Sequence, residues 1–338
     1  MTNRQLSTPP EKRSRTTWIL TTLVTGFSLL LLLFQTLCYT QQYDACAAVT
    51  VYPSWVWFLC GLCFALILIR NKNKRTVVAT LCLWLLFLVF FADTPLSLWR
   101  GIGSPSDREW IDAREQQRTM RVISLNCSGR KTSVLALKQW EPELILLQET
   151  PNKNQLTEIT NELMGANGVF LSGVDTSLIT RGEIELIAAT GNYIAGKITL
   201  PSGQELVVAS LRLSPPPFRF DLWNPECWRA FRDHRMKQRA EVKDLSQVLA
   251  ALPTGLPVIV GGDFNANPRD PIFAELPASL QDAFVSAGSG WGNTIINDIP
   301  FLRIDQIWIN DSFQPVRVIA NTSVDTDHRT VIADLIFK

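Results

Sequence analysis

Two polar side chains that follow a short apolar run near residue 260 have the types and spacing needed for phosphate chemistry. Residues 258–260 are all β-branched and stand between a proline and two glycines, which predicts a buried strand with an abrupt end. Asp263 and Asn265 come next, and residues i and i+2 of an extended backbone point to the same side. The carboxylate could take a cation or a proton, and the amide could donate to a phosphoryl oxygen without adding negative charge. On its own, the pair is explained equally well as an Asx-type turn that ends the strand.

Other strand-like runs after residue 120 also end in, or are interrupted by, polar residues. Besides Asp263 and Asn265, these are Asn126, Glu149, Asp305, and the neighbours Asp327 and His328. A single buried or turn aspartate is usually structural. Five such positions, each in a short recognisable setting, indicate one shared site.

Five short motifs, taken in order, resemble the endonuclease/exonuclease/phosphatase family, which has the deoxyribonuclease I-like fold. The motifs are Ser124-Leu125-Asn126, Leu147-Gln148-Glu149, Gly261-Gly262-Asp263-Phe264-Asn265, Arg303-Ile304-Asp305 and Thr326-Asp327-His328. The resemblance covers residues 120–338 and leaves the first hundred residues outside it. It implies an α/β fold, a four-layer sandwich of two packed mixed β-sheets flanked by helices, and metal-dependent cleavage of phosphate esters.

The resemblance implies that some of the motif residues bind a metal ion. By position, Glu149 would be the main ligand of Mg²⁺ (or Mn²⁺), with Asn126 close by and Asp327 in contact directly or through water. A hard divalent ion prefers oxygen ligands and keeps several waters, which fits this set. Such an ion helps water to attack a phosphate ester because it neutralises the developing negative charge.

The resemblance also implies the groups that move protons and hold the substrate. His328 would be the acid/base imidazole, and Asp305 the carboxylate that orients it. Asp263 would align or deprotonate the attacking water, and Asn265 would hold a phosphoryl oxygen. A histidine, with an unperturbed pKa of about 6.5, can exchange protons near neutral pH, and a neighbouring carboxylate fixes its tautomer.

The sequence departs from the family at one position. The family usually has a second histidine at the end of the strand before the proline-rich loop, and Arg212 stands there instead. Arginine stays protonated, so it cannot act as a base, but it can bind phosphate through two parallel hydrogen bonds. We expect Arg212 to bind the substrate, and an ordinary outward-facing strand arginine is the alternative. His234, the only other histidine, could replace the missing one from the helix, but a single histidine among charged helix residues is expected to be solvated.

Short apolar runs with few helices between them make up the chain after residue 120. Strands are expected at residues 121–125, 144–147, 184–189, 193–200, 205–213, 258–260, 304–309, 316–319 and 331–337, and the main helices at 133–140, 155–164 and 228–251. Many strands with few helices between them predict packed sheets flanked by helices, in an α/β or α+β sandwich. The last helix carries Arg232, Arg235 and Arg239 on one face, where they could meet an anionic substrate or lipid headgroups. Acidic residues are interleaved with them, which favours a solvated, salt-bridged surface.

Three long apolar stretches precede residue 100, at about 18–38, 49–69 and 77–92. The first two reach the roughly 20 residues that a helix needs to span a bilayer, and the third does so only with residues 96–99 at the boundary. We expect a membrane domain with three transmembrane helices (residues 1–99), a linker (100–119) and a catalytic domain (120–338). The alternative is a soluble protein that buries three such helices.

The cations that flank these stretches predict the orientation. Lysines and arginines precede the first stretch and lie between the second and the third, whereas residues 39–54 contain neither. By the positive-inside rule the N-terminus is cytoplasmic, and the catalytic domain, after three crossings, is extracytoplasmic. The protein is therefore expected to be a multi-pass membrane protein in contact with membrane lipids.

The expected function is hydrolysis of a phosphodiester, or a phosphomonoester, by a membrane-anchored enzyme that activates water. From residue 119 onward the chain has 20 Lys and Arg against 24 Asp and Glu, so it lacks the basic excess typical of nucleic-acid binders. The substrate class stays open between a lipid headgroup, nucleic acid and a small molecule. Two alternatives stay open as well: an extracytoplasmic nuclease, and a binding or sensor protein on the same fold. The sequence identifies no protein partner.

Overall fold

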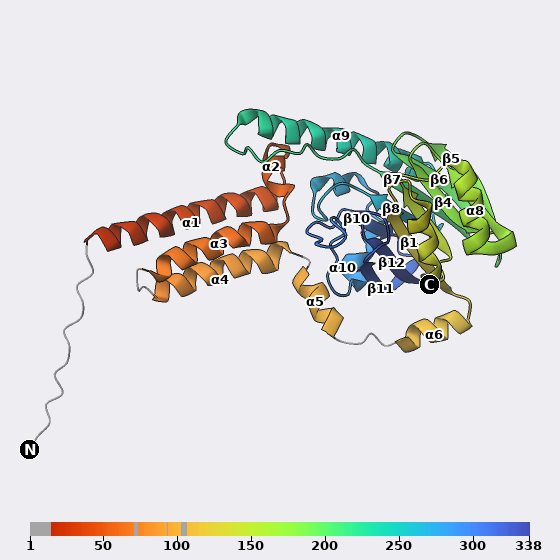
Figure 1. Cartoon of the computed structure of the whole chain (residues 1–338), viewed down its shortest axis with the longest axis horizontal. Helices are drawn as coiled ribbons and strands as arrows, with labels where there is room; N and C mark the ends of the chain where they lie inside the picture. Colours follow the sequence, from red (N-terminus) through yellow and green to blue (C-terminus); the bar gives the residue numbers. More distant parts are fainter. Residues whose placement is uncertain (1–14, 71–73, 93, 103–106) are drawn as a thin grey trace, which may run out of the picture. The chain divides into compact units, whose positions relative to one another are not determined.

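The computed structural model of the chain describes residues 15–70, 74–92, 94–102 and 107–338 (Figure 1). These residues form two compact units. The first comprises the described residues of Met1–Gln41 and Ser54–Ala92, and the second comprises Gln42–Pro53 and the described residues of Asp93–Lys338. The short connection at residues 42–53, which the sequence places within the membrane domain, thus packs with the second unit.

Among the described residues, the first unit consists of three apolar helices, α1 (Arg15–Gln41), α3 (Ser54–Ile69) and α4 (Lys74–Phe91). By length and composition α1 and α4 could each cross a membrane, whereas the 16 residues of α3 reach that length only when the short helices before it are counted. Trp84 of α4 is fully buried and donates from its indole nitrogen to Ser28 Oγ of α1 at 3.0 Å. The helices therefore pack on one another, and two to three of them are candidate spans.

The second apolar stretch forms a shorter helix than the sequence predicts. A span over residues 49–69 is expected, but α3 begins at Ser54, and Pro53 separates it from the short helix α2 (Ala47–Thr50). The buried alanines of α2 pack against Phe231 of the second unit. An apolar run has the same signature whether lipid or protein covers it, so hydropathy alone does not distinguish a membrane span from a helix that packs on protein.

The second unit is built on two six-stranded mixed β-sheets. Their strand orders are β11-β12-β1-β2-β4-β3 and β5-β6-β7-β8-β10-β9. In each sheet one pair of neighbours is parallel, β1 with β2 and β7 with β8, and the other pairs are antiparallel. The strands are β1 (Thr119–Asn126), β2 (Leu144–Gln148), β3 (Gly168–Ser172), β4 (Thr176–Arg181), β5 (Glu183–Ala189), β6 (Tyr193–Thr199), β7 (Glu205–Arg212), β8 (Val258–Asp263), β9 (Gln281–Asp282), β10 (Asp305–Ile309), β11 (Phe313–Asn321) and β12 (Thr330–Phe337).

Side chains alternate along the strands and so fill two cores at once. Met120 and Val122 of β1 belong to the core between the two sheets, together with residues of the second sheet such as Val208. Ile123 and Leu125 of the same strand belong to a second core on the outer face of the first sheet. All five side chains are at most 1% exposed, so β1 is buried on both faces.

Helices cover both outer faces and make this unit a four-layer α/β sandwich (Figure 1). On the first sheet lies α8 (Lys153–Met164), with Ile159 in the outer core. On the second lies α9 (Pro225–Ala250), with Leu245 buried against the sheet. The expected sandwich of two packed mixed sheets flanked by helices is confirmed. The remaining described α-helices of the unit are α2, α5 (Thr94–Ile102), α6 (Asp107–Glu115), α7 (Lys131–Leu135) and α10 (Ala283–Ala287).

A buried arginine of α9 bonds both to an aspartate and to the segment 42–53. Arg235 of this helix is 2% exposed, and its Nη2 donates to Asp270 Oδ2 at 2.8 Å and to Thr50 Oγ1 at 2.6 Å. The Asn267 amide donates to the backbone oxygens of Thr50 at 3.1 Å and Val51 at 2.9 Å. The expectation of a solvated surface is therefore wrong for Arg235, which joins two segments far apart in the sequence.

Substitution of Arg235 is expected to destabilise the second unit strongly. Arg235→Met removes the cation but leaves the Asp270 carboxylate buried, which should lower the free energy of unfolding by about 3–5 kcal/mol. The matched control is Arg232→Met, because Arg232 pairs with Asp233 on the surface, where an ion pair contributes at most about 1 kcal/mol. Urea unfolding of the full chain in detergent micelles, followed by near-ultraviolet circular dichroism, measures both. Equal losses in the two variants would contradict the anchoring role of Arg235.

Candidate active site

The ends of several strands meet at one edge of the sandwich and carry polar residues there. Asn126 ends β1 and Glu149 follows β2, and because these strands are parallel both residues reach the same edge. In the other sheet Arg212 ends β7, in register with Asp263 at the end of β8. Asp305, the first residue of the antiparallel β10, lies opposite Asp263. The topology thus brings together residues that are far apart in the sequence.

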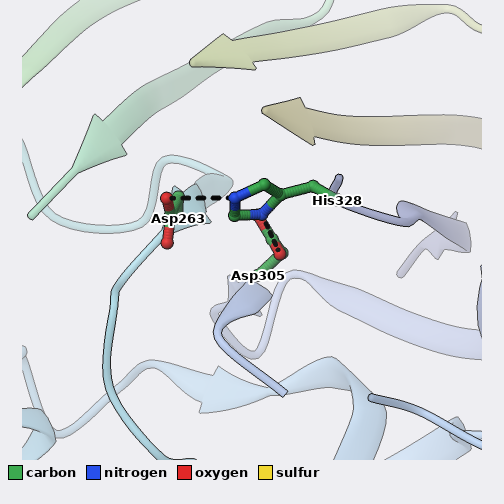
Figure 2. Close-up of side chains that lie close together, drawn as sticks. All are labelled: Asp263, Asp305 and His328. Carbon is green, nitrogen blue, oxygen red and sulfur yellow. Dashed lines mark hydrogen bonds and ion pairs between the residues drawn. The ribbon is translucent and has the colours of Figure 1, made fainter. Parts of the chain in front are cut away.

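The His328 imidazole lies between two buried carboxylates, as Figure 2 shows. Its Nδ1 is 2.9 Å from Asp305 Oδ2, and its Nε2 is 4.0 Å from Asp263 Oδ2. His328 is 6% exposed, and each of the two aspartates is 1% exposed. A bond donated from Nδ1–H to Asp305 fixes the tautomer and leaves Nε2 directed at Asp263. The structure therefore places side by side the three residues that the sequence suggests for proton transfer.

The second of the two glycines before Asp263 is required by the backbone. At Gly262, φ is +150° and a Cβ would lie 1.9 Å from Leu211 O, so no larger residue fits. Beyond the strand, Asn265 N donates to Asp263 Oδ1 at 3.0 Å, as in an Asx-type turn. The Asn265 amide donates to Leu213 O at 2.9 Å and to Asp263 Oδ2 at 3.2 Å. Both amide protons are engaged, so a phosphoryl oxygen would have to replace one of these acceptors.

Arg212 lies among three carboxylates of the site. Its Nη2 donates to Glu149 Oε1 at 2.7 Å, and its Nη1 donates to Asp175 Oδ2 at 2.8 Å. Its Nε is 4.0 Å from Asp263 Oδ2. The side chain is 28% exposed, so Arg212 is part of the site and not an ordinary outward-facing arginine. Asp175, in the turn between β3 and β4, is a site residue that sequence reasoning misses, because nothing distinguishes it there from any other turn aspartate.

Hydrogen bonds connect the residues assigned to the metal. Asn126 Nδ2 donates to Glu149 Oε1 at 3.2 Å and to Asp263 Oδ2 at 3.1 Å, while its Oδ1 accepts from Ser128 N at 3.2 Å. Asp327 is exposed at the rim and accepts from Ser128 Oγ at 3.3 Å. In this arrangement Asn126 joins two carboxylates as a donor, and its oxygen points away from them.

Burial and neighbouring charges shift the pKa values of His328 and Asp263. Burial alone would lower the pKa of His328, but the charge and hydrogen bond of Asp305, together with the charges of Asp263 and Asp327, raise it to about 10. Burial, and then the charge of Asp305, raises the pKa of Asp263 to about 7, although His328 opposes this. At neutral pH the imidazole is thus a cation with a proton to donate, and Asp263 in its ionised form is a carboxylate basic enough to accept one.

The sequence model of the Endonuclease/Exonuclease/phosphatase family matches residues 123–328, from the middle of β1 to His328. The chain belongs to this family. Members of the family are metal-dependent hydrolases of phosphate esters, and the protein is an enzyme of that class. The match covers every polar strand end described above.

Solved structures with the endonuclease/exonuclease/phosphatase fold resemble the chain. D. rerio TDP2 humanized by 14 mutations is 19% identical, with a TM-score of 0.50 over 64% of this chain and 99% of that one. The mannosyl-6-phosphatase of Bacteroides thetaiotaomicron is 16% identical, with a TM-score of 0.50 over 64% and 100% of the two chains. A further family protein from the same organism is 15% identical, with a TM-score of 0.50 over 65% and 95%. Such identities establish the fold alone. No curated protein matches the sequence.

The donor atoms of the site suit the divalent cation on which the family depends. Glu149, Asp263 and Asp327 offer carboxylate oxygens, which hard divalent ions prefer. One donor atom each from Asp263, Asp305 and His328 lies within 4.8 Å of the other two. Asp305 Oδ1 is buried and, among the described residues, has no hydrogen-bond partner. The residues present therefore fit a divalent ion, on the Glu149 side or within the aspartate–histidine cluster.

Proposed function

We propose that this family member is a membrane-anchored hydrolase of a phosphodiester, or of a phosphomonoester, that holds Mg²⁺ (or Mn²⁺) through Glu149. The observation that carries the proposal is the His328 imidazole between Asp305 and Asp263, at 2.9 Å and 4.0 Å. We assign the ion to the Glu149 side because Nδ1 of His328 is already bonded to Asp305. Asp327, at the rim, would reach the ion directly or through water.

The side chains supply the proton transfers that hydrolysis requires. When bound, the divalent ion neutralises negative charge that develops on the phosphoryl group. Asp263 accepts a proton from the attacking water, for which its raised pKa of about 7 makes it a competent base. His328 donates the Nε2 proton to the leaving oxygen, and Asp305 stabilises the imidazolium through its bond to Nδ1.

Arg212 holds the substrate in this mechanism and takes no part in proton transfer. Its Nη groups are paired with Glu149 and Asp175, while its buried Nε has no hydrogen-bond partner among the described residues. A phosphoryl oxygen would satisfy that donor, and Asn265 would donate to a second oxygen. The position of the family's second histidine is thus filled by a fixed positive charge.

The second unit supports three crossings of the membrane. Residues 42–53 share a core with the catalytic domain, which supports placing both on the same side of a bilayer. The chain must then cross the bilayer an even number of times between residues 53 and 93, where α3 and α4 lie. If α4 spans the bilayer, α3 must therefore span it as well. This agrees with the orientation that the lysines and arginines predict, in which both segments are extracytoplasmic.

Hydrolysis by the full chain in lipid nanodiscs tests the proposed function. We expect the wild type to cleave bis(p-nitrophenyl) phosphate or p-nitrophenyl phosphate, to stop when EDTA removes the metal, and to resume on addition of Mg²⁺ or Mn²⁺. The control is Glu149→Ala, prepared in the same way. Activity that survives equally in this variant would come from a contaminant, and no hydrolysis by the wild type would favour a binding protein.

A further inference from the structure

Three aromatic side chains project from the loop between β7 and α9. Phe218, Phe220 and Trp223 are 90%, 61% and 86% exposed. Backbone hydrogen bonds nevertheless hold the loop, from Leu222 N to Phe220 O at 2.9 Å and from Asn224 N to Asp221 O at 2.8 Å. Exposed apolar groups on a fixed loop mark a surface that binds another apolar phase or molecule.

Tyr52 connects this loop to the point where a candidate membrane span starts. Its hydroxyl donates to Arg219 O at 3.0 Å, and its ring lies 6.4 Å from the ring of Phe220. In the sequence Tyr52 comes two residues before Ser54, the first residue of α3. Two residues of extended chain reach at most about 7 Å. The aromatic loop is therefore tied to the residue at which α3 begins.

The sequence around Tyr52 has the composition of a membrane–water interface. Tyr43 and Tyr52 stand near the two ends of the connection between α1 and α3, and Trp55 and Trp57 follow at the beginning of α3. Tyrosine and tryptophan are enriched at the headgroup level of a bilayer, because their rings are apolar and their tips are polar. Where α3 enters a bilayer at its first turn, Tyr52 and the loop bonded to it lie at that level.

We propose that Phe218, Phe220 and Trp223 insert into the headgroup region of the bilayer that anchors the chain, and that the active site takes its phosphate ester from a lipid of that bilayer. The second part rests on the proposed function and specifies its substrate class. Insertion gives the three side chains the apolar surroundings that they lack in water, as for interfacial segments in general.

The same loop leads directly into the site. It starts after Arg212, and Leu213 O accepts the hydrogen bond from the Asn265 amide at 2.9 Å. The chain thus runs without a break from the phosphate-binding residues to the aromatic side chains, which themselves touch no group of the site. The charge balance of 20 basic against 24 acidic residues after position 118 also favours a lipid over nucleic acid, which needs phosphate neutralisation along its length.

The substrate test compares one ester in the bilayer with one in water. The full chain is reconstituted in vesicles of phosphatidylcholine and phosphatidylglycerol with Mg²⁺, and headgroup release is measured beside hydrolysis of bis(p-nitrophenyl) phosphate. The variant Phe218→Ser/Trp223→Ser should release headgroups about tenfold more slowly, because two apolar anchors are lost, and should hydrolyse the soluble ester at the wild-type rate. The matched control is Leu186→Ser on β5, which removes a residue 53% exposed and should change neither rate.

The outcomes separate the inference from the proposed function. If the wild type hydrolyses the soluble ester but no vesicle lipid, or if the aromatic variant releases headgroups as fast as the wild type, the inference is wrong and the proposed function stands. Preference for a single-stranded DNA oligonucleotide over the vesicle lipids would also overturn the inference. Failure to hydrolyse any ester would contradict the proposed function itself.

Insertion is measured without reference to activity. The difference in emission between the wild type and Trp223→Phe isolates the signal of Trp223 in the same vesicles. We expect brominated phosphatidylcholine to quench that signal and aqueous iodide to leave it largely unchanged. Quenching by iodide alone would show that Trp223 stays in water and would overturn the inserted loop.

Discussion

Replacement of His328 by asparagine is expected to lower kcat about 10²- to 10⁴-fold, the loss that follows removal of a general acid/base. In the wild type Nδ1 is bonded to Asp305 and Nε2 faces Asp263. Asparagine can still donate to Asp305, so the buried carboxylate keeps a partner and the fold is retained. No group remains at the place of Nε2 to protonate the leaving oxygen. Steady-state kinetics with bis(p-nitrophenyl) phosphate, beside a urea unfolding curve, measure the effect.

The second histidine of the chain provides a matched control for His328→Asn. His234 lies on α9, where its Nε2 is bonded to Ser214 O at 2.9 Å and where burial lowers its pKa. It contacts none of the groups assigned to proton transfer, so His234→Asn should keep kcat close to that of the wild type. Near-normal turnover in His328→Asn, or equal losses in both variants, would contradict the proposed mechanism.

The pH dependence of kcat gives the His328 assignment a second measurement. Asp263, with its pKa raised to about 7, is available as a base above that pH and becomes protonated as the pH falls through it. His328, with its pKa raised to about 10, is a proton donor below that pH and loses its proton as the pH rises through it. The profile should therefore be bell-shaped. In His328→Asn the alkaline limb should disappear and the acid limb should remain.

The strand ends of the site could be predicted because local sequence specifies them. The β-branched run before Gly261 and Gly262 ends where the backbone needs a glycine, and Asp263 and Asn265 follow at once. Motif order then relates these residues to the other strand ends. The pairing of hydrogen-bond donors and acceptors in the site depends on how the two sheets pack, and it cannot be predicted from the sequence. The orientation of the Asn126 amide, as a donor to Glu149, is one such detail.

Residues that act through distant contacts could not be predicted. Arg235 shares its helix face with Arg232 and Arg239 in the sequence, yet it is buried against Asp270 because residues 42–53 cover it. That segment overlaps an apolar stretch of the sequence, and hydropathy does not show whether lipid or protein will bury it. Asp175 illustrates the same limit at the site, since only the position of Arg212 gives this turn residue a role.

Replacement of Glu149 by glutamine is expected to raise the Mg²⁺ concentration needed for half-maximal activity about 10²- to 10³-fold. A unit charge 4 Å from another contributes about 4 kcal/mol at an effective dielectric constant of 20, and each 1.4 kcal/mol is tenfold in affinity. Removal of the Glu149 charge also leaves the positive charge of Arg212 less neutralised, because Arg212 is bonded to Glu149 Oε1 at 2.7 Å. That charge then repels the incoming cation. Activity titrated with Mg²⁺ in the full chain measures the change.

Asp175→Asn is the control that separates metal binding from the general loss of a negative charge. Asp175 and Glu149 both pair with Arg212, at 2.8 Å and 2.7 Å, and their side chains are 32% and 35% exposed. The two substitutions therefore remove the same charge from the same guanidinium. If Glu149 binds the metal and Asp175 only positions Arg212, Glu149→Gln shifts the Mg²⁺ requirement and Asp175→Asn raises KM for the ester without that shift. Equal shifts in both variants would mean that the ion responds to the net charge around Arg212 and that Glu149 is not its ligand.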